Sequence, residues 1–163
     1  MEFTLETRGI QEAIKILQSL KKDVTRLDFE RSAEKGLENV RRAAIANVRA
    51  VTRRRTGRLQ DAIVIKRMDA RVRRRYGYFA GSYVGVDYKK APHGHLIEYG
   101  TGPRFRTTKS GVKSRTGTHK ATPFLRPAYQ ENRELIFRDA RSELGDRIQR
   151  KINRAVRANR ARV

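Results

Sequence analysis

Three residues in the middle of the chain carry side chains that could do chemistry: His93, His95 and Glu98. Imidazole nitrogens and a carboxylate can bind zinc, and the same groups serve in acid–base catalysis. If this segment is helical, His95 and Glu98 share a face at i, i+3. Neither a third ligand nor a nucleophile accompanies them, so we favour a short helix whose polar groups brace a loop. We therefore predict no metal, no cofactor and no catalytic residue.

Other motifs that carry chemistry are missing from the sequence. The chain has no Cys, which excludes disulfides and Cys-ligated metals. It contains neither GxxxxGK[ST] nor GxGxxG, so the Gly-Thr-Gly run at 100–102 is not a phosphate-binding loop. We expect Gly100 instead to end the short helix in a left-handed conformation. These observations argue against an enzyme.

The charge of the chain points to an anionic partner. Its 163 residues include 39 Lys and Arg against 17 Asp and Glu, a net charge of +22. The excess lies in residues 41–75, 101–120 and 138–163. The partner could be nucleic acid, an acidic protein or a membrane surface. No apolar run approaches the roughly 20 residues of a membrane span, and no secretory signal is visible. We expect a protein that is made in the cytoplasm and used there or in a particle assembled there.

Hydrophobic periodicity predicts the elements that position these groups. Helices are expected at 9–22, 26–52 and 123–158, and strands at 3–7, 62–68 and 78–87. Asp23 or Asp28 could cap the second helix, and Pro123 and Pro127 suit the start of the last one.

Two basic segments are expected to lack regular structure. Residues 69–77 read as a hairpin arm or a mobile loop, and residues 101–121 as a long basic loop that is rich in Gly and Thr. We predict a single domain over 1–163, with a basic helical extension at 138–163. The fold class is α+β: a small, mostly antiparallel β-sheet packed by two N-terminal helices and one long C-terminal helix.

Three groups of cations are predicted to contact nucleic acid or an acidic partner. Those of the last helix fall on one face beside an apolar stripe, and the other two groups flank the first internal strand. The alternative is an ordinary solvated surface. Without a base-reading motif, any contact should be with the backbone. The residues are Arg53, Arg54, Arg55, Arg73, Arg74, Arg75, Arg147, Arg150, Lys151, Arg154 and Arg157.

Two segments, taken in order, are similar to a known family. KAPHGHLIEYGT occupies residues 90–101 and TPFLRPAY occupies 122–129, with RTGRL at 55–59 before them. This order resembles the neck or minor tail proteins of long-tailed phages, also described as tail-completion or head–tail joining proteins. The matching blocks cover about 25 residues, and the order of elements fits the rest of the chain. The chain is more basic than expected of that family.

The resemblance implies a non-enzymatic ring of roughly six or twelve copies, placed in the virion at the head–tail junction around the DNA channel. Its neighbours would be head-completion or adaptor proteins and tail-terminator or tail-tube proteins. Glu98 would fix the short helix and its loop, by ion pairing or by accepting backbone N–H groups. Structural or interface roles are implied for Arg58, Leu59, His95, Glu98, Gly100, Thr101, Phe124, Leu125, Arg126 and Pro127.

Two other classes of protein remain open at this point. A nucleoid or ribosome-associated protein would also be basic, but it would bind DNA or RNA tightly as a monomer or dimer. A metal hydrolase that uses His93, His95 and Glu98 would carry bound metal.

Overall fold

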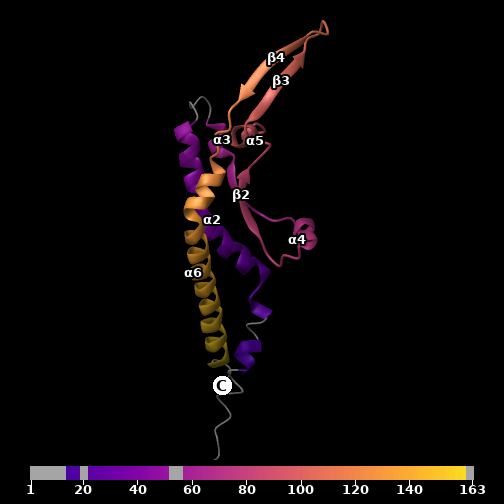
Figure 1. Ribbon diagram of the computed structural model, residues 1–163. Helices are drawn as coiled ribbons and strands as arrows, with labels where there is room; N and C mark the ends of the chain where they lie inside the picture. Colours follow the sequence, from indigo (N-terminus) through magenta and orange to yellow (C-terminus); the bar gives the residue numbers. More distant parts are fainter. Residues whose placement is uncertain (1–13, 19–21, 52–56, 161–163) are drawn as a thin grey trace, which may run out of the picture.

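Two long antiparallel helices form the frame of the molecule (Figure 1). The computed structural model describes residues 14–18, 22–51 and 57–160. Helix α2 spans Arg26–Val51 and helix α6 spans Leu125–Arg160. Asp28 at the start of α2 contacts Lys151 near the end of α6, and Asn47 near the end of α2 donates to the carbonyl of Phe124. Both helices lie where the periodicity of the sequence predicts them.

Helix α2 packs against α6 through the apolar stripe that defines it. Leu37, Val40, Ala44 and Val48 are buried and recur at steps of three and four. The helices lie close together at Gly36, where an added Cβ would lie 2.4 Å from the carbonyl oxygen of Ile136. A residue without a side chain is therefore required at this point of the contact.

The start of α2 is tied to the far end of α6 by one carboxylate. Asp28 accepts hydrogen bonds from the backbone N–H of Thr25 at 2.8 Å and from Lys151 Nζ at 2.5 Å. Lys151 also donates to the carbonyl oxygen of Asp23. Burial opposes ionisation of Asp28, but the hydrogen bonds from Lys151 and Thr25 outweigh it and lower its pKa to about 2. Of the two candidate caps, Asp23 and Asp28, it is Asp28 that stabilises the start of α2, from within its first turn and through the N–H of Thr25, and it also anchors α6.

The contact between Asp28 and Lys151 makes the free energy of unfolding depend on pH. Because the pKa of Asp28 falls from 3.8 to about 2 on folding, its contribution is complete above pH 3.8 and is lost as the pH falls toward 2. Asp28→Asn should lower the free energy of unfolding by about 2 kcal/mol at pH 7, and by progressively less at pH 3.5, 3 and 2.5. Urea titrations at these pH values check it. A deficit that did not change with pH would contradict this account of the contact.

The strands of the described residues form two separate antiparallel pairs. β1 (Ile63–Arg67) pairs with β2 (Ser82–Val86), with Ile63 opposite Val86 and Arg67 opposite Ser82. β3 (Thr101–Thr107) pairs with β4 (Lys113–His119). The short helices are α3 (Arg58–Asp61), α4 (Ala70–Tyr76) and α5 (Gly94–Tyr99). The predicted α+β class is confirmed, but two two-stranded sheets replace the single small sheet.

The hydrophobic core is small and lies where α2, β1 and the start of α6 meet. Phe124 and Ile63 are its largest apolar side chains, at 0% and 1% exposure. The other buried members are Leu59, Ala62, Ala91 and Ala128, with the apolar stripe of α2. No described helix combines the length and hydrophobicity that crossing a bilayer requires.

Two expectations about the basic segments are wrong. Residues 69–77 connect the paired strands β1 and β2, as a hairpin arm would, but they are not a mobile loop, because Ala70–Tyr76 forms α4, capped by the Asp69 side chain and ended by Gly77 at φ 68°. Residues 101–121 are not a long loop either, because they contain the β3–β4 hairpin. The strand expected at 3–7 lies outside the described residues. Of the helix expected at 9–22, residues 14–18 and 22 are described, and they are helical.

Candidate functional site

The carboxylate of Glu98 holds the first turn of α6. Its Oε2 accepts the backbone N–H groups of Phe124 at 2.8 Å and Leu125 at 2.9 Å, and its Oε1 accepts that of Arg126 at 3.0 Å. The first N–H groups of a helix have no partner within it and carry partial positive charge, so a carboxylate is well placed there. Glu98 is buried at 7% exposure and comes from α5, outside α6. Two roles were considered for Glu98, ion pairing and acceptance of backbone N–H groups. In the structure it accepts backbone N–H groups.

The same region fixes the base of the β3–β4 hairpin. Thr122 N–H donates to the carbonyl of Ile97 at 2.8 Å, and His119 N–H donates to Thr101 Oγ1 at 3.0 Å. Gly100, between α5 and β3, has φ 73° and ψ −175°. Its φ is positive as expected, but its ψ is extended and not left-handed helical. A Cβ here would lie 2.7 Å from the backbone nitrogen of Ala121. The hairpin therefore leaves the body in one direction, as Figure 1 shows.

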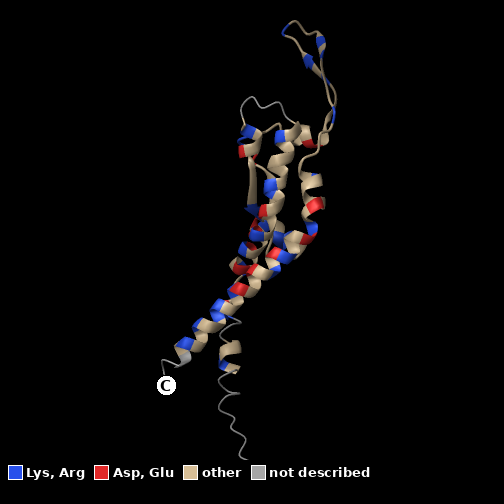
Figure 2. Ribbon diagram, turned by 90° about the vertical axis from the view of Figure 1, so that its left-hand side faces the viewer, with Lys and Arg blue, Asp and Glu red and all other residues tan. Residues whose placement is uncertain are grey.

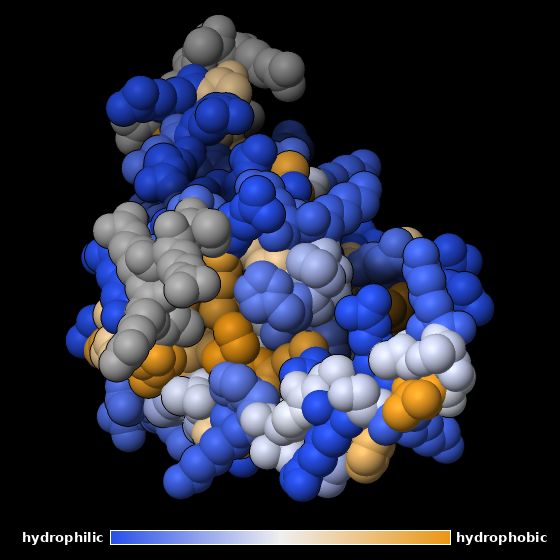
Figure 3. Space-filling model, turned by 90° about the horizontal axis from the view of Figure 1, so that it is seen from above, coloured by the Kyte–Doolittle hydropathy of each residue, from blue (hydrophilic) through white to orange (hydrophobic). Residues whose placement is uncertain are grey.

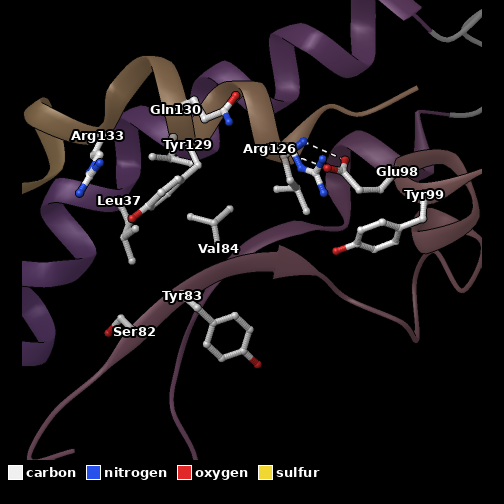
Figure 4. Close-up of a pocket in the computed structure, with 12 residues that line it drawn as sticks. Leu37, Ser82, Tyr83, Val84, Glu98, Tyr99, Arg126, Tyr129, Gln130 and Arg133 are labelled. Carbon is white, nitrogen blue, oxygen red and sulfur yellow. Dashed lines mark hydrogen bonds between the residues drawn. The ribbon is translucent and has the colours of Figure 1, made fainter. Parts of the chain in front are cut away.

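A groove of about 920 Å³ lies between β2, α5 and the start of α6 (Figure 4). Val84 and Leu125 are half-buried within it, whereas Tyr83, Tyr99 and Tyr129 are 44%, 72% and 48% exposed. Its other lining residues include Arg126, Gln130 and Arg133. The groove is open and partly aromatic, which is more typical of a protein interface than of a small-molecule site.

The residues singled out for metal or acid–base chemistry are not arranged for it. Both oxygens of Glu98 accept hydrogen bonds from α6. His95 is exposed, and its ring lies 5.7 Å from that of Tyr88. Within residues 14–18, 22–51 and 57–160, no three His, Asp or Glu side chains lie where they could hold a metal together. The structure supports the bracing role of this segment.

The three arginines of α4 that were predicted to contact an anionic partner divide into one half-buried cation and two exposed ones. Arg73 is 14% exposed, and its Nη1 lies 3.1 Å from Glu30 Oε1. Glu30 is 1% exposed and also faces Arg26 at 3.6 Å and Arg67 at 3.8 Å. Because a buried carboxylate needs a cationic partner, Arg73 has a structural contact here. Arg74 and Arg75 are exposed.

Three of the cations predicted on α6 have an acidic partner, although the side chain of Arg150 is 63% exposed. Arg147 and Arg150 lie 2.8 and 3.5 Å from Glu143, and Lys151 contacts Asp28. Arg154 and Arg157, one and two turns further on, are exposed. Arg53, Arg54 and Arg55 lie outside the described residues. Only some of the cations that were predicted to contact an anionic partner could therefore contact a polyanion.

The other residues of the phage-like motifs are mostly packed. Leu59 and Phe124 are buried, and Leu125, Pro127 and Thr101 are half-buried. Arg58 lies in α3, immediately before β1, and is exposed; Arg126 is also exposed. Arg126 meets Glu98 through its backbone N–H.

Comparison with known proteins decides the family. The sequence model of the bacteriophage HK97-gp10-like family, described as tail components, matches residues 11–100. That is just over half of the 163 residues. The chain belongs to the HK97-gp10-like family of phage tail components. It is therefore a structural protein of the virion. Neither the curated proteins nor the solved structures include a match to it.

The part of the chain that matches the HK97-gp10-like family ends at Gly100. It includes α2, the β1–β2 pair and α5, with the carboxylate of Glu98. The β3–β4 hairpin and α6 lie beyond it. In this HK97-gp10-like chain, Glu98 thus connects the matched region to α6.

Sequence reasoning missed two sites that organise the structure. Glu30 looks like any acidic residue of a polar helix, and nothing in the sequence places it opposite Arg73. Gly36 interrupts the apolar stripe of α2, and a glycine within a helical pattern is a recognised sign of close packing. That signal could have located the contact with Ile136 in this HK97-gp10-like protein.

Proposed function

We propose that this chain is a ring-forming subunit of the head–tail junction, which connects head and tail around the DNA channel and catalyses no reaction. Membership of a tail-component family supports a structural role. The neighbours in this proposal are head-completion or adaptor proteins on one side and tail-terminator or tail-tube proteins on the other. The ring would contain roughly six or twelve copies.

The observation that carries the proposal is the exposure of the aromatic side chains. Of the eleven aromatic residues in the described part of the chain, ten are exposed, by 38% for Phe29 to 72% for Tyr99. Only Phe124 among them is buried. Large exposed aromatic surface is typical of protein interfaces. We infer that neighbouring copies and ring partners cover these side chains in the particle.

The electrostatics add a condition on assembly. Copies that each carry +22 repel one another, so a closed ring needs an anionic partner or screening by salt. We propose that the exposed cations of α4 and of the end of α6 meet DNA or acidic neighbours. The competing function, a host nucleic-acid-binding protein, would bind DNA or RNA tightly as a monomer or dimer and would need no other virion protein.

Removal of the gene from the phage genome tests the proposal. We expect the lysate to contain DNA-filled heads and finished tails that do not join, as seen by electron microscopy. Joined particles should return when the wild-type chain is supplied from a plasmid. Normal virions without the gene product would contradict the proposed function, and a DNA-bound monomer or dimer that is absent from purified virions would favour the competing one.

A further inference from the structure

The β3–β4 hairpin is a charged surface that projects from the rest of the described chain. Figures 1 and 2 show it standing away from the helices, with Lys and Arg along it and no acidic residue. Apart from Thr101 and Gly117, every residue from 101 to 119 is exposed. It carries Arg104, Arg106, Lys109, Lys113 and Arg115. Nothing within the hairpin neutralises these cations.

The register of the hairpin distributes its cations over both faces. Phe105 pairs with Arg115 and Thr107 pairs with Lys113, whereas Arg106 pairs with Ser114. Directly opposed residues share a face, and successive residues of a strand alternate between faces. Lys113 and Arg115 therefore lie on one face and Arg106 on the other. A ribbon that is cationic on both faces can be surrounded by anionic groups.

These features fit the phosphate backbone of duplex DNA better than a protein surface. The buried centre of a protein interface is depleted in charge and rich in apolar side chains, whereas the hairpin has only Phe105 and Val112 as large exposed apolar residues. Arg and Lys are the usual donors to phosphate oxygens. A two-stranded ribbon also fits within the major groove of B-form DNA. Figure 3 shows that this end of the molecule is hydrophilic over most of its surface, with an apolar patch near the centre of the view.

Contacts at the base of the hairpin fix the direction in which it leaves the body of the molecule. Glu98 fixes α5 to α6, and the Thr122–Ile97 and His119–Thr101 hydrogen bonds hold the two ends of the hairpin. Gly100 packs against the chain that leaves β4, with no room for a side chain. Every copy in a ring would thus direct its hairpin the same way. An arm fixed at its base is suited to meet DNA at one place.

We propose that the β3–β4 hairpin is an arm that binds the phosphate backbone of duplex DNA without reading its sequence. The inference rests on the proposed function for the presence of DNA inside the junction. Its physical basis is independent of that function: five exposed cations on a projecting ribbon that has no acidic residue.

Two variants with equal net charge test the arm. The hairpin variant carries Arg104→Gln, Arg106→Gln, Lys113→Gln and Arg115→Gln. The control carries Arg31→Gln, Lys35→Gln, Arg49→Gln and Lys90→Gln, at four exposed cations of the body. Binding to a fluorescent 30-base-pair duplex of mixed sequence is measured by anisotropy between about 50 and 200 mM salt.

We expect the hairpin variant to bind DNA about tenfold or more weakly than the wild type, and its slope of log K against log salt to fall by about 3 to 4. The control should keep most of the wild-type slope. Equal losses in the two variants would overturn the proposal, because net charge alone would then explain binding. It would also be overturned if the hairpin variant lost affinity for polyglutamate and kept it for DNA, since the partner would then be an acidic protein.

A second measurement does not depend on the stability of these variants. Because the chain has no Cys, a photo-crosslinker can be attached at Ser110→Cys on the hairpin tip or at the exposed control position Ser142→Cys on α6. We expect crosslinks to duplex DNA from the tip and few from α6; the reverse pattern would overturn the proposal. Both tests use the purified chain, so absence of the chain from virions would refute the proposed function and leave their outcome unaffected.

Discussion

Replacement of Glu98 by alanine should lower the free energy of unfolding by about 3–5 kcal/mol, the largest loss that we expect from a single substitution. The carboxylate accepts three backbone N–H groups at the start of α6, at 2.8 to 3.0 Å. Hydrogen bonds to a charged group contribute about 1.5–3 kcal/mol each and are not additive. Alanine would leave the buried N–H of Phe124 without an acceptor. Urea unfolding followed by circular dichroism measures the loss.

Two further variants separate this role from a general effect of charge. Glu134→Ala removes an exposed carboxylate from α6 and should change the free energy of unfolding by no more than about 0.5 kcal/mol. Glu98→Gln should fall between the two, because its amide group keeps one acceptor and turns an N–H donor toward another donor. If Glu98→Ala were as stable as Glu134→Ala, the assigned role of Glu98 would be wrong.

The same Gly→Ala substitution should have opposite effects at two positions of the long helices. At Gly36 the new methyl group would lie 2.4 Å from the carbonyl oxygen of Ile136, so α2 and α6 would have to separate. Overpacking of this kind costs about 1–3 kcal/mol and outweighs the gain in helix propensity of about 1 kcal/mol. We expect Gly36→Ala to lower the free energy of unfolding by about 1 kcal/mol, the middle of that cost less the gain in helix propensity.

Gly145 on α6 is the matched control, because a Cβ built there meets nothing within 4 Å. Gly145→Ala should raise the free energy of unfolding by about 0.5–1 kcal/mol through helix propensity alone. The two variants should therefore differ by about 2 kcal/mol in chemical denaturation. An equal stabilisation by both would mean that α2 and α6 do not touch at Gly36.

The helical frame was predictable from the sequence because burial imposes a period on it. The apolar stripe of α2 recurs at steps of three and four, and its buried members are those that the pattern selects, from Leu37 to Val48. The last helix was predicted within two residues of its observed ends. The structural role of Glu98 was anticipated only as two alternatives, because sequence spacing cannot tell which donors a carboxylate meets.

The secondary structure of the two basic segments was predicted wrongly, because runs of charged residues lack the apolar periodicity that indicates a helix or a strand. Arginine is a good helix former, and α4 also has a capping aspartate and a terminal glycine, so its signals were present beside the Arg run. The β3–β4 hairpin buries neither face, so no apolar alternation marks its strands.

The groups of cations predicted to contact an anionic partner contain two kinds of residue: some form ion pairs within the fold and others are exposed. Arg73 and Lys151 belong to buried or half-buried ion pairs with Glu30 and Asp28. Arg74 and Arg154 are exposed, although the sequence presents them identically. Partners that lie more than 40 residues away in the chain decide the difference, and spacing within a run of cations contains no information about them.

The most direct test of a head–tail joining role is a cryo-electron microscopy reconstruction of the junction in purified virions. We expect a closed ring whose repeated density fits the antiparallel α2 and α6 pair, with the β3–β4 hairpins directed toward the DNA. A junction whose rings are fully explained by other proteins would contradict it.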